Sequence, residues 1–486
     1  MNAMPRTLKS PDHAEKISAI KGATQDVSGN PAIISHRAGA RLQQGSVWVY
    51  ESDIEKLPKN LAPGALVPVL DRRGFLYGTA LYSASSQIAL RLFARDAEIT
   101  RPQFLFLAAD RLRAAIARRA SLFSAETNAA RLVFSEADEL PGLIVDRYAD
   151  LVIVQLLTQG TAADDFRETV TNVLVSCLAF SEDNAPDDNP FAATPLTAIV
   201  ERPDPRIREL EQIPAPSSEP LYLANAITRG EHAHRPHAEL ASEPNPEPAA
   251  PLATVFSLNG LRLHFDANSG QKTGAFLDQR ENYAAAARHA AAAAGDKSAL
   301  DVCTYQGGFA LHLAQVCPRV TGVDASRAAL EVAERNLQLN QDKLDAALAA
   351  AYPGENGRLE SQVDWLEADA FALLRDYASA GHRYSTIVLD PPAFAKSKRA
   401  AESALRGYKE MNLRALQMIS PGGILVTCSC SHHVSLADFT AAVASAAADA
   451  GRRVSLLETR SAAVDHPVIL TLPETYYLKC LIARVD

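Results

Sequence analysis

The sequence predicts an α/β protein in which a small β-barrel and a middle α/β unit precede a larger domain built on a parallel sheet. Short alternating apolar runs separated by glycine and proline turns dominate residues 36–107, and helix and strand patterns mix over residues 108–211. From about residue 254, apolar strands alternate with amphipathic helices. This alternation is typical of a parallel sheet with helices on both faces, whose ligands bind at the carboxyl ends of the strands.

Each element follows from its local pattern. Barrel strands are expected within residues 46–54, 65–82 and 87–94. The middle unit should contain a helix over 104–123, strands around a Pro-Gly turn within 131–157, and a strand running into a helix over 195–213. In the last domain we expect strands at 298–305, 319–325, 384–392 and 422–429, with helices at 309–317, 329–340 and 407–419.

The composition of the 486-residue chain, with 47% hydrophobic and 22% charged residues, is that of a globular protein. No apolar run approaches the roughly 18 residues of a membrane-spanning helix, and the N-terminus has no apolar signal core. We therefore expect a cytoplasmic protein with no membrane partner. The six cysteines lack the spacing of a zinc site or a disulfide framework, so no metal is predicted.

Charge is distributed unevenly along the chain, although the net charge is only -9. Residues 1–120 contain 17 lysines and arginines against 10 aspartates and glutamates, whereas residues 181–250 contain 5 against 13. The basic front end suits a nucleic-acid partner. We interpret residues 1–35 as a disordered leader and residues 212–253 as an acidic, proline-rich insertion.

Successive strand ends of the last domain carry residues that suit a nucleoside cofactor. Gly307 and Gly308 follow the first strand and allow a tight backbone turn. Asp324 closes the next strand 17 residues after Gly307, where a carboxylate can accept both hydroxyls of a ribose. Asp369 follows at the next strand end, where it could hold an adenine amino group. Either carboxylate alone could instead cap a helix.

The glycine turn differs from the G-x-G-x-x-G pattern that cradles the pyrophosphate of a nicotinamide cofactor. S-adenosylmethionine (SAM) carries no phosphate, so a looser turn is sufficient. This half of the chain resembles a class I (Rossmann-like) SAM-dependent methyltransferase. The resemblance implies cofactor contacts from the turn, Tyr305 included, and from the two carboxylates.

The next strand ends in Asp390-Pro391-Pro392, which resembles the (D/N)-P-P motif of class I enzymes that methylate bases or amides. The two prolines fix the backbone and lack N–H groups, so carbonyl groups and the carboxylate should face the substrate. A carboxylate suits cytosine, because it can accept from the amino group or from protonated N3. The loop that follows is basic, which indicates either RNA phosphate binding or an ordinary solvated surface. Its candidate contacts are Lys396, Lys398 and Arg399.

Methylation of cytosine at C5 requires a thiolate that adds to C6 and makes C5 nucleophilic. Cys428 and Cys430 are two positions apart on one strand and so share a face. Cys428 lies within the apolar run ILVTC and is expected in the core. Cys430 is expected at the mouth, between Ser429 and Ser431, and is the predicted nucleophile.

Residues from about 36 to 486 resemble bacterial ribosomal RNA cytosine-C5 methyltransferases with an N-terminal PUA domain. The matching stretches include SVWVYESDI, SEADELPGLIVDRY, GQKTGAFLDQRENY, YQGGFA, DPPAFAKSK, SCS and DHPV. In that family the SCS cysteine is the nucleophile, which maps onto Cys430. For the stretch GQKTGAFLDQR the resemblance implies that the site is nearby but fixes no single role. Lys272 and Arg280 are candidate RNA contacts, and Asp278 and Gln279 are candidate cofactor contacts, although the charged residues could simply form the exposed entry of a helix.

The sequence thus predicts an enzyme that transfers a methyl group from SAM to C5 of a cytosine in 23S ribosomal RNA through a covalent cysteine adduct. Two alternatives stay open: methylation of guanine at N7, which needs no thiol, and a non-catalytic RNA-binding factor for ribosome assembly. Large-subunit ribosomal RNA is the predicted partner, and a homodimer is left open.

Overall fold

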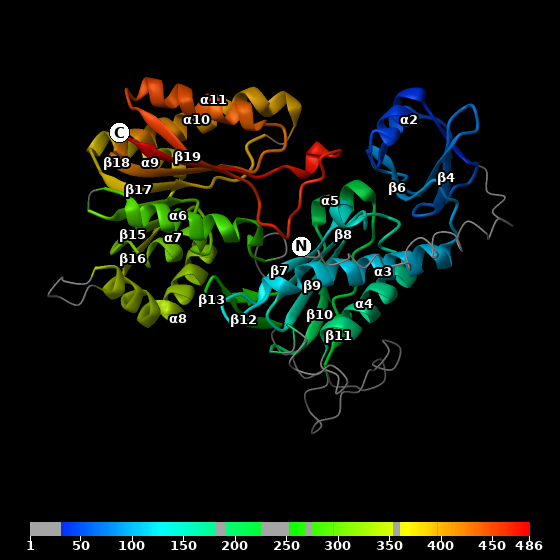
Figure 1. Cartoon of the computed structure of the whole chain (residues 1–486), viewed down its shortest axis with the longest axis horizontal. Coiled ribbons are helices and arrows are strands. Elements are labelled where there is room, and N and C mark those ends of the chain that lie inside the picture. Colours follow the sequence, from blue (N-terminus) through cyan, green and yellow to red (C-terminus); the bar gives the residue numbers. More distant parts are fainter. Residues whose placement is uncertain are drawn as a thin grey trace, which may run out of the picture. The chain divides into compact units, whose positions relative to one another are not determined.

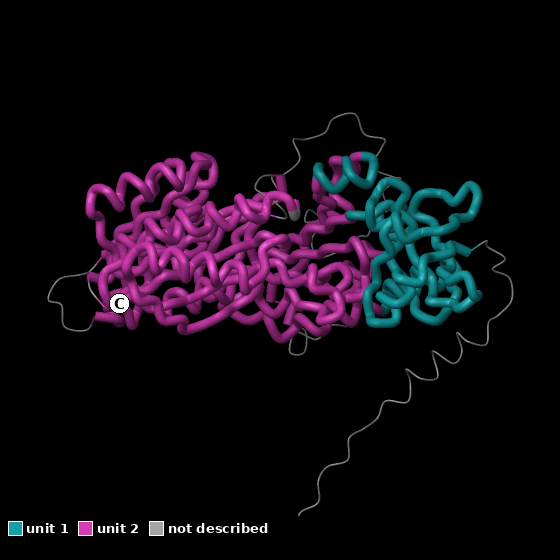
Figure 2. The backbone as a smooth tube through the Cα atoms, turned by 90° about the horizontal axis from the view of Figure 1, so that it is seen from above, with its two compact units in different colours: residues 1–110, 157–169, 205–214 teal, residues 111–156, 170–204, 215–486 magenta. Residues whose placement is uncertain are grey.

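The computed structural model describes most of the chain, and Figure 1 shows its helices and strands. The described residues are 31–179, 190–191, 193–224, 252–268, 274–294, 296–352, 360–395 and 397–486. They belong to two compact units (Figure 2). The first unit takes in residues 1–110, 157–169 and 205–214, and the second takes in residues 111–156, 170–204 and 215–486.

Two of the predicted segments lie largely outside the described residues. Of the leader predicted for residues 1–35, only residues 31–35 are described, and they include strand β1 (Ala32–Ile34). The predicted leader is therefore too long, because a three-residue strand is too short to show alternation. Of the insertion predicted for residues 212–253, residues 225–251 are outside the description. The other predicted domain boundaries stay a prediction.

The first unit is built on a six-stranded sheet in the order β2-β6-β5-β4-β1-β3. Besides β1, its strands are β2 (Trp48–Tyr50), β3 (Ile54–Lys56), β4 (Leu66–Leu70), β5 (Leu76–Tyr82) and β6 (Ile88–Arg95). Helix α2 (His36–Gln43) begins after Ser35, whose hydroxyl accepts a hydrogen bond from the Ala38 N–H. A later segment, α5 (Pro205–Glu211), belongs to this unit and places Glu211 2.9 Å from the buried guanidinium of Arg91. The strands predicted within 46–54, 65–82 and 87–94 are confirmed.

The second unit contains a five-stranded sheet, a two-stranded hairpin and a seven-stranded sheet. The five-stranded sheet has the order β11-β10-β9-β8-β7. Its strands are β7 (Ala129–Phe134), β8 (Leu143–Tyr148), β9 (Leu151–Leu156), β10 (Ala198–Glu201) and β11 (Tyr222–Leu223). The hairpin consists of β12 (Ala253–Leu258) and β13 (Leu261–Asp266), and the ring of Phe265 stacks on that of Tyr148 at a centroid distance of 4.0 Å. Two long helices of the chain are α3 (Arg101–Arg119) and α4 (Asp164–Leu178).

The seven-stranded sheet has the order β16-β15-β14-β17-β18-β20-β19. Its strands are β14 (Ser298–Val302), β15 (Arg319–Asp324), β16 (Gln362–Glu367), β17 (Tyr384–Leu389), β18 (Ile419–Ser429), β19 (Val454–Arg460) and β20 (Lys479–Val485). Strands β14 to β18 are parallel, but β20 runs antiparallel to both β18 and β19, so the predicted parallel sheet is in fact mixed. The chain reaches β20 from β19 without a crossover helix, and only such a crossover would make the two strands parallel.

Helices cover both faces of this sheet (Figure 1). On one face are α6 (Arg280–Ala292), α7 (Gly308–Leu313) and α8 (Arg327–Ala351), and on the other are α9 (Ala370–Ala380), α10 (Ala401–Met418) and α11 (Leu436–Asp449). Alternate residues of each strand enter the two cores: Val426 and Cys428 pack with the first helix set, and Leu425 packs with the second. The helix predicted at 309–317 is shorter than expected: α7 ends at Leu313, and a turn then leads into β15.

Candidate active site

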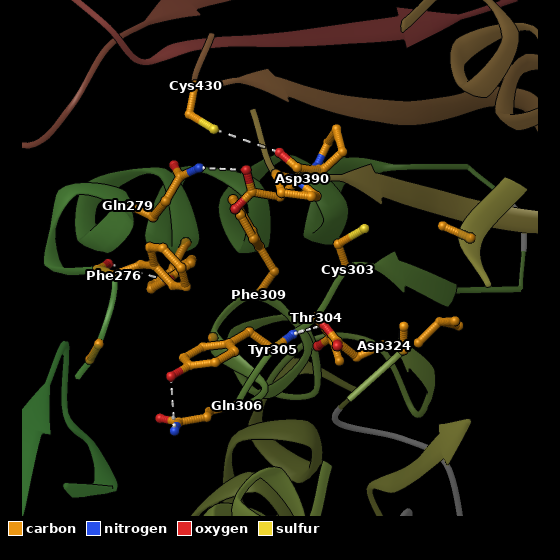
Figure 3. A pocket seen from close by; sticks show the side chains of 18 of the residues that line it. Phe276, Gln279, Cys303, Thr304, Tyr305, Gln306, Phe309, Asp324, Asp390 and Cys430 are labelled. Atoms are coloured by element: carbon orange, nitrogen blue, oxygen red, sulfur yellow. Dashed lines mark hydrogen bonds between the residues drawn. The ribbon is translucent and has the colours of Figure 1, made fainter. Parts of the chain in front are cut away.

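A cavity of about 330 Å³ opens in the second unit at the carboxyl ends of the parallel strands. Figure 3 shows Cys430 and Asp390 on one side of it and Tyr305 and Asp324 on the other. The predicted site residues that line it are Asp278, Gln279, Tyr305, Gly308, Asp324, Asp369, Asp390, Pro391, Pro392 and Cys430. Residues from five strand ends and from the segment before α6 thus meet in one place, as expected for a parallel α/β sheet.

The remaining predicted residues are not among the described residues that line the cavity. Gly307 forms the turn behind it, and Arg399 is exposed in the short helix η6 (Lys398–Ala400). Lys272 and Lys396 lie outside the described residues, as does the side chain of Lys398. Arg280 is buried and pairs with the Asp465 carboxylate at 3.3 Å, so the predicted RNA contact for Arg280 is wrong.

The buried carboxyl group of Asp301 stabilises the turn after β14. Cys303 and Tyr305 adopt positive φ angles of 66° and 51°, which are unusual for residues other than glycine. Asp301 supports this backbone from inside the sheet: its Oδ2 accepts from the Thr304 hydroxyl at 2.5 Å and from the Ala310 N–H at 2.9 Å. Burial raises the pKa of Asp301 to about 7.

Glycine is required at two positions of this turn, for a different structural reason at each. Gly307 has φ of 87°, a left-handed conformation that a side chain would strain. Gly308 lies against a ring, since an added Cβ would come within 2.5 Å of the Tyr283 ring. The close approach of helix α7 to Tyr283 therefore requires glycine at position 308.

Main-chain donors fix the two carboxylates on the cofactor side. Asp324 accepts from the Tyr305 N–H through Oδ2 and from the Ser326 N–H through Oδ1, both at 2.9 Å. A carboxylate has about four lone-pair positions, so it can still accept from a diol. Asp324 does not cap α8, because Ser326 is the N-cap of that helix. Asp369 does cap α9, through a 2.9 Å hydrogen bond from the Ala372 N–H, and it also lines the cavity.

Asp390 and Cys430 lie at the ends of the adjacent strands β17 and β18. The Cys430 thiol donates a hydrogen bond to the Pro391 carbonyl oxygen at 3.8 Å, and the Gln279 Nε2 donates to the Asp390 Oδ1 at 2.9 Å (Figure 3). The predicted difference in depth between the two cysteines is confirmed: Cys428 is fully buried, whereas Cys430 is partly exposed and faces the cavity. Burial, together with Cys480 and Asp390, raises the pKa of the Cys428 thiol well above its usual value.

The residue after the thiol is anchored on three sides. The Ser431 Oγ lies 2.9 Å from the Tyr408 hydroxyl and accepts from the Ala395 N–H, and the Ser431 carbonyl accepts from the Lys479 Nζ at 2.7 Å. Lys479 also donates to the Tyr477 carbonyl at 2.9 Å. Burial lowers the pKa of Lys479 to about 8, and the nearby Cys430 partly opposes that shift.

Sequence reasoning missed Asp301, Lys479 and Asp465 as parts of this site. Each is a charged residue inside an apolar or aromatic run, in SALDV, YYLKCLIARV and AAVDHPV. A charge in such a run is unusual, because charged side chains are seldom buried without a partner, and this could have identified the three residues from the sequence. Asp465 is fully buried and accepts from the Arg131 N–H at 2.9 Å as well as from Arg280. This carboxylate therefore ties the segment before β20 to both β7 and the start of α6.

Two further properties concern only the described part of the chain. There, no group of three or more histidine, cysteine and acidic side chains is placed to hold a metal ion. None of the helices there combines the length and the apolar character needed to span a bilayer.

Comparison with known proteins places the chain in a family. Residues 32–95 match the model of a PUA-like domain. Over 447 residues the chain is 35% identical to ribosomal RNA large subunit methyltransferase I of Shewanella amazonensis, covering 91% of this chain and 96% of that protein. It is 36% identical over 441 residues to the protein of the same name from Tolumonas auensis, covering 90% and 94%. The chain belongs to the ribosomal RNA large subunit methyltransferase I family.

The fold agrees with this family. A Streptococcus mutans protein provisionally named a SAM-dependent methyltransferase has a solved structure that superimposes with a TM-score of 0.67. The match covers 93% of this chain and 99% of that one at 16% sequence identity, which shows a shared fold. The predicted fold class is therefore confirmed: a PUA-like domain precedes a domain with the SAM-dependent methyltransferase fold.

Proposed function

We propose that this family member transfers a methyl group from SAM to C5 of a cytosine in 23S ribosomal RNA through a covalent bond between Cys430 and C6. One observation carries the proposal: the partly exposed Cys430 thiol and the Asp390 carboxylate lie at neighbouring strand ends and face the same cavity. The thiol donates a hydrogen bond to the Pro391 carbonyl oxygen at 3.8 Å. A thiol has no role in methylation at guanine N7, which makes the cytosine product the better match.

The residues on the other side of the cavity fit SAM. Asp324 would receive the ribose hydroxyls, because both of its oxygens are already oriented by backbone N–H groups and retain lone pairs. Asp369 would accept from the adenine amino group, and Phe371 and Ala368 supply apolar surface nearby. SAM would supply an electrophilic methyl group. The names of the relatives support this cofactor and large-subunit ribosomal RNA as the substrate.

The base would be activated by the chain's own residues. The Cys430 thiolate adds to C6, and the electron pair of the C5–C6 bond moves to C5, which then takes the methyl group. Loss of the C5 proton and departure of the thiolate restore the aromatic ring. Asp390 would hold the base by accepting from its amino group or from protonated N3. The cytosine must leave its stack to reach the cavity, at a cost of a few kcal/mol.

The basic first 120 residues would supply salt-dependent affinity for the RNA phosphates, as would Lys272, Lys396, Lys398 and Arg399. A cytoplasmic location suits an enzyme whose relatives are named for ribosomal RNA.

Two measurements test the cytosine assignment directly. Bisulfite sequencing of 23S ribosomal RNA should show one protected cytosine in cells with the gene and none in cells without it. Wild-type protein should also form a gel-stable adduct, dependent on SAM, with RNA that contains 5-fluorocytidine, because fluorine cannot leave as a cation. Methylation without either signal would refute transfer to cytosine C5.

A further inference from the structure

A chain of hydrogen-bonded side chains leads to the proposed base-binding carboxylate from the far edge of the sheet. Arg460, at the end of β19, donates through Nε to the Asn282 Oδ1 at 2.8 Å. The Asn282 Nδ2 donates to the Gln279 Oε1 at 2.6 Å, and the Gln279 Nε2 donates to the Asp390 Oδ1 at 2.9 Å. Gln279 and Asn282 are both buried, with 2% and 1% of their surfaces exposed. We call these four side chains the amide relay.

The direction of the relay is fixed at its first member. A guanidinium can only donate, so the Asn282 oxygen must face Arg460 and the Asn282 nitrogen must face Gln279. The Gln279 oxygen then accepts, which turns its nitrogen toward Asp390. Each of the two amide groups can therefore adopt only one of its two flipped orientations, and the Asp390 Oδ1 always faces an N–H donor. An amide held at one end only could flip and present an oxygen to the carboxylate instead.

We propose that Gln279 is a positioning residue that, oriented by Asn282 and Arg460, holds the Asp390 carboxylate in the one orientation in which it can receive the target base. The inference rests on the proposed function, because it needs Asp390 to bind the base. It differs from the role that the sequence predicts for Gln279, which is contact with the cofactor. In the relay, one N–H of the Gln279 amide points to Asp390 and one lone pair of its oxygen points to Asn282, so the orientation of this amide is set by Asp390 and Asn282 rather than by a cofactor.

The surroundings of Asp390 allow a test by titration. Burial raises the pKa of Tyr283, Cys303 and Cys428, all of which are close enough for the Asp390 charge to raise them further. These groups therefore stay neutral near neutral pH. The titratable side chains that face the Gln279–Asp390 pair are Asp278, Tyr283, Cys303, Cys428 and Cys430. All of them are present in wild-type and variant proteins alike, and Gln279→Met adds no charge, so its activity ratio to wild type is the reference against which the ratio of Gln279→Glu is compared.

The first variant removes the donor and keeps the shape. Gln279→Met should lower the turnover number by about 10- to 30-fold at every pH, because Asp390 loses the group that orients it. The assay follows transfer of a tritiated methyl group to large-subunit ribosomal RNA from cells that lack the gene, so it does not depend on which base is modified. The same substitution at Gln155, a buried glutamine in β9 outside the cavity, is the control for loss of a buried amide.

The second variant distinguishes positioning from packing. In Gln279→Glu two carboxyl groups face each other at hydrogen-bond distance, and such a pair shares one proton with a raised pKa. The shared proton restores a donor to Asp390. The activity of Gln279→Glu relative to wild type should therefore rise as the pH falls from about 8 to about 6, whereas the ratio for Gln279→Met should stay flat.

A third variant tests the direction of the relay from a distance. Asn282→Asp keeps the acceptor for Arg460 but puts an oxygen where Gln279 needs a donor. Gln279 should then turn its amide, and turnover should fall toward the level of Gln279→Met although Asp390 itself is unchanged. Thermal unfolding of each variant shows whether a loss of turnover reflects a loss of folded protein.

Three outcomes would overturn the proposal. Full turnover in Gln279→Met would show that Asp390 needs no donor there. A weaker affinity for SAM by calorimetry with an unchanged turnover number would make Gln279 a cofactor ligand, as the sequence predicts. A flat pH ratio for Gln279→Glu would reduce its role to packing. None of these depends on the bisulfite result, so failure of the cytosine assignment is recognised separately.

Discussion

The two sides of the cavity are built from different kinds of contact. On the side of β15 and β16, backbone N–H groups no more than 19 residues away hold Asp324, and Asp369 is held by an N–H three residues away. On the side of β17 and β18, Asp390 is held by the Gln279 side chain 111 residues away, and the Cys430 thiol meets a carbonyl 39 residues away.

This difference has a consequence for function. Backbone donors are present whatever the neighbouring side chains are, so the proposed cofactor side depends on a few carboxylates and on the shape of the turn. The proposed base side depends on the identity of distant side chains. Substitutions on the first side should therefore change affinity for SAM, and those on the second should change turnover.

The largest effect is expected on the base side, at the thiol. Cys430→Ala should lower the turnover number by at least about 10³-fold and abolish the 5-fluorocytidine adduct, because the thiol proposed to add to C6 is lost. Its affinity for SAM should stay within about twofold of wild type. Cys428→Ala, which removes the buried thiol two positions earlier, is the control and should still form the adduct. An adduct from Cys430→Ala would make another thiol the nucleophile.

The next effect probes the cofactor side. Asp324→Ala should weaken SAM binding by about 30- to 150-fold, or about 2–3 kcal/mol, while turnover at saturating SAM changes little. Calorimetry measures the affinity. Asp364→Ala, an exposed aspartate on the neighbouring strand β16, should bind SAM like wild type. Equal affinity in the two variants would remove Asp324 from the cofactor site.

Beneath the cofactor side, the buried Asp301 should make stability depend on pH. Its pKa is raised to about 7 in the folded protein, so the folded state binds more protons than the unfolded state between about pH 4 and pH 7. Its contribution to stability is full below this window and is lost as the pH rises through it. Asp301→Asn, which cannot ionise, should gain about 2 kcal/mol relative to wild type between about pH 5 and pH 8 in denaturant unfolding. A constant difference would contradict the raised pKa.

The smallest effect separates the two roles of Asp369. Serine is a good N-cap but too short to reach the cavity, so Asp369→Ser should keep the stability of α9 and weaken SAM binding by roughly 10-fold. Asp369→Ala should show the same loss of affinity and should also destabilise the protein by about 1 kcal/mol. If the serine variant binds SAM normally, Asp369 is a helix cap and nothing more.

The same division explains what the sequence could predict. The positions of Asp324 and Asp369 at the cavity were predictable, because each residue belongs to a pattern within one βα unit, where strand, turn and helix follow one another. The greater depth of Cys428 relative to Cys430 was predictable from the apolar run before it. The hydrogen bond from Gln279 to Asp390 was not, because no local pattern links positions 111 residues apart. The role of Lys479 depends in the same way on β20 being inserted beside β18.

The antiparallel insertion of β20 also constrains the order in which the protein can be completed during synthesis. In the described structure β19 pairs only with β20, so this strand leaves the ribosome before its hydrogen-bonding partner exists. The Lys479 ammonium group that anchors the Ser431 carbonyl arrives with the same late strand. A nascent chain that has reached Arg460 thus carries the thiol, all five parallel strands and the Tyr408 and Ala395 contacts to Ser431, yet lacks the Lys479 contact to the Ser431 carbonyl.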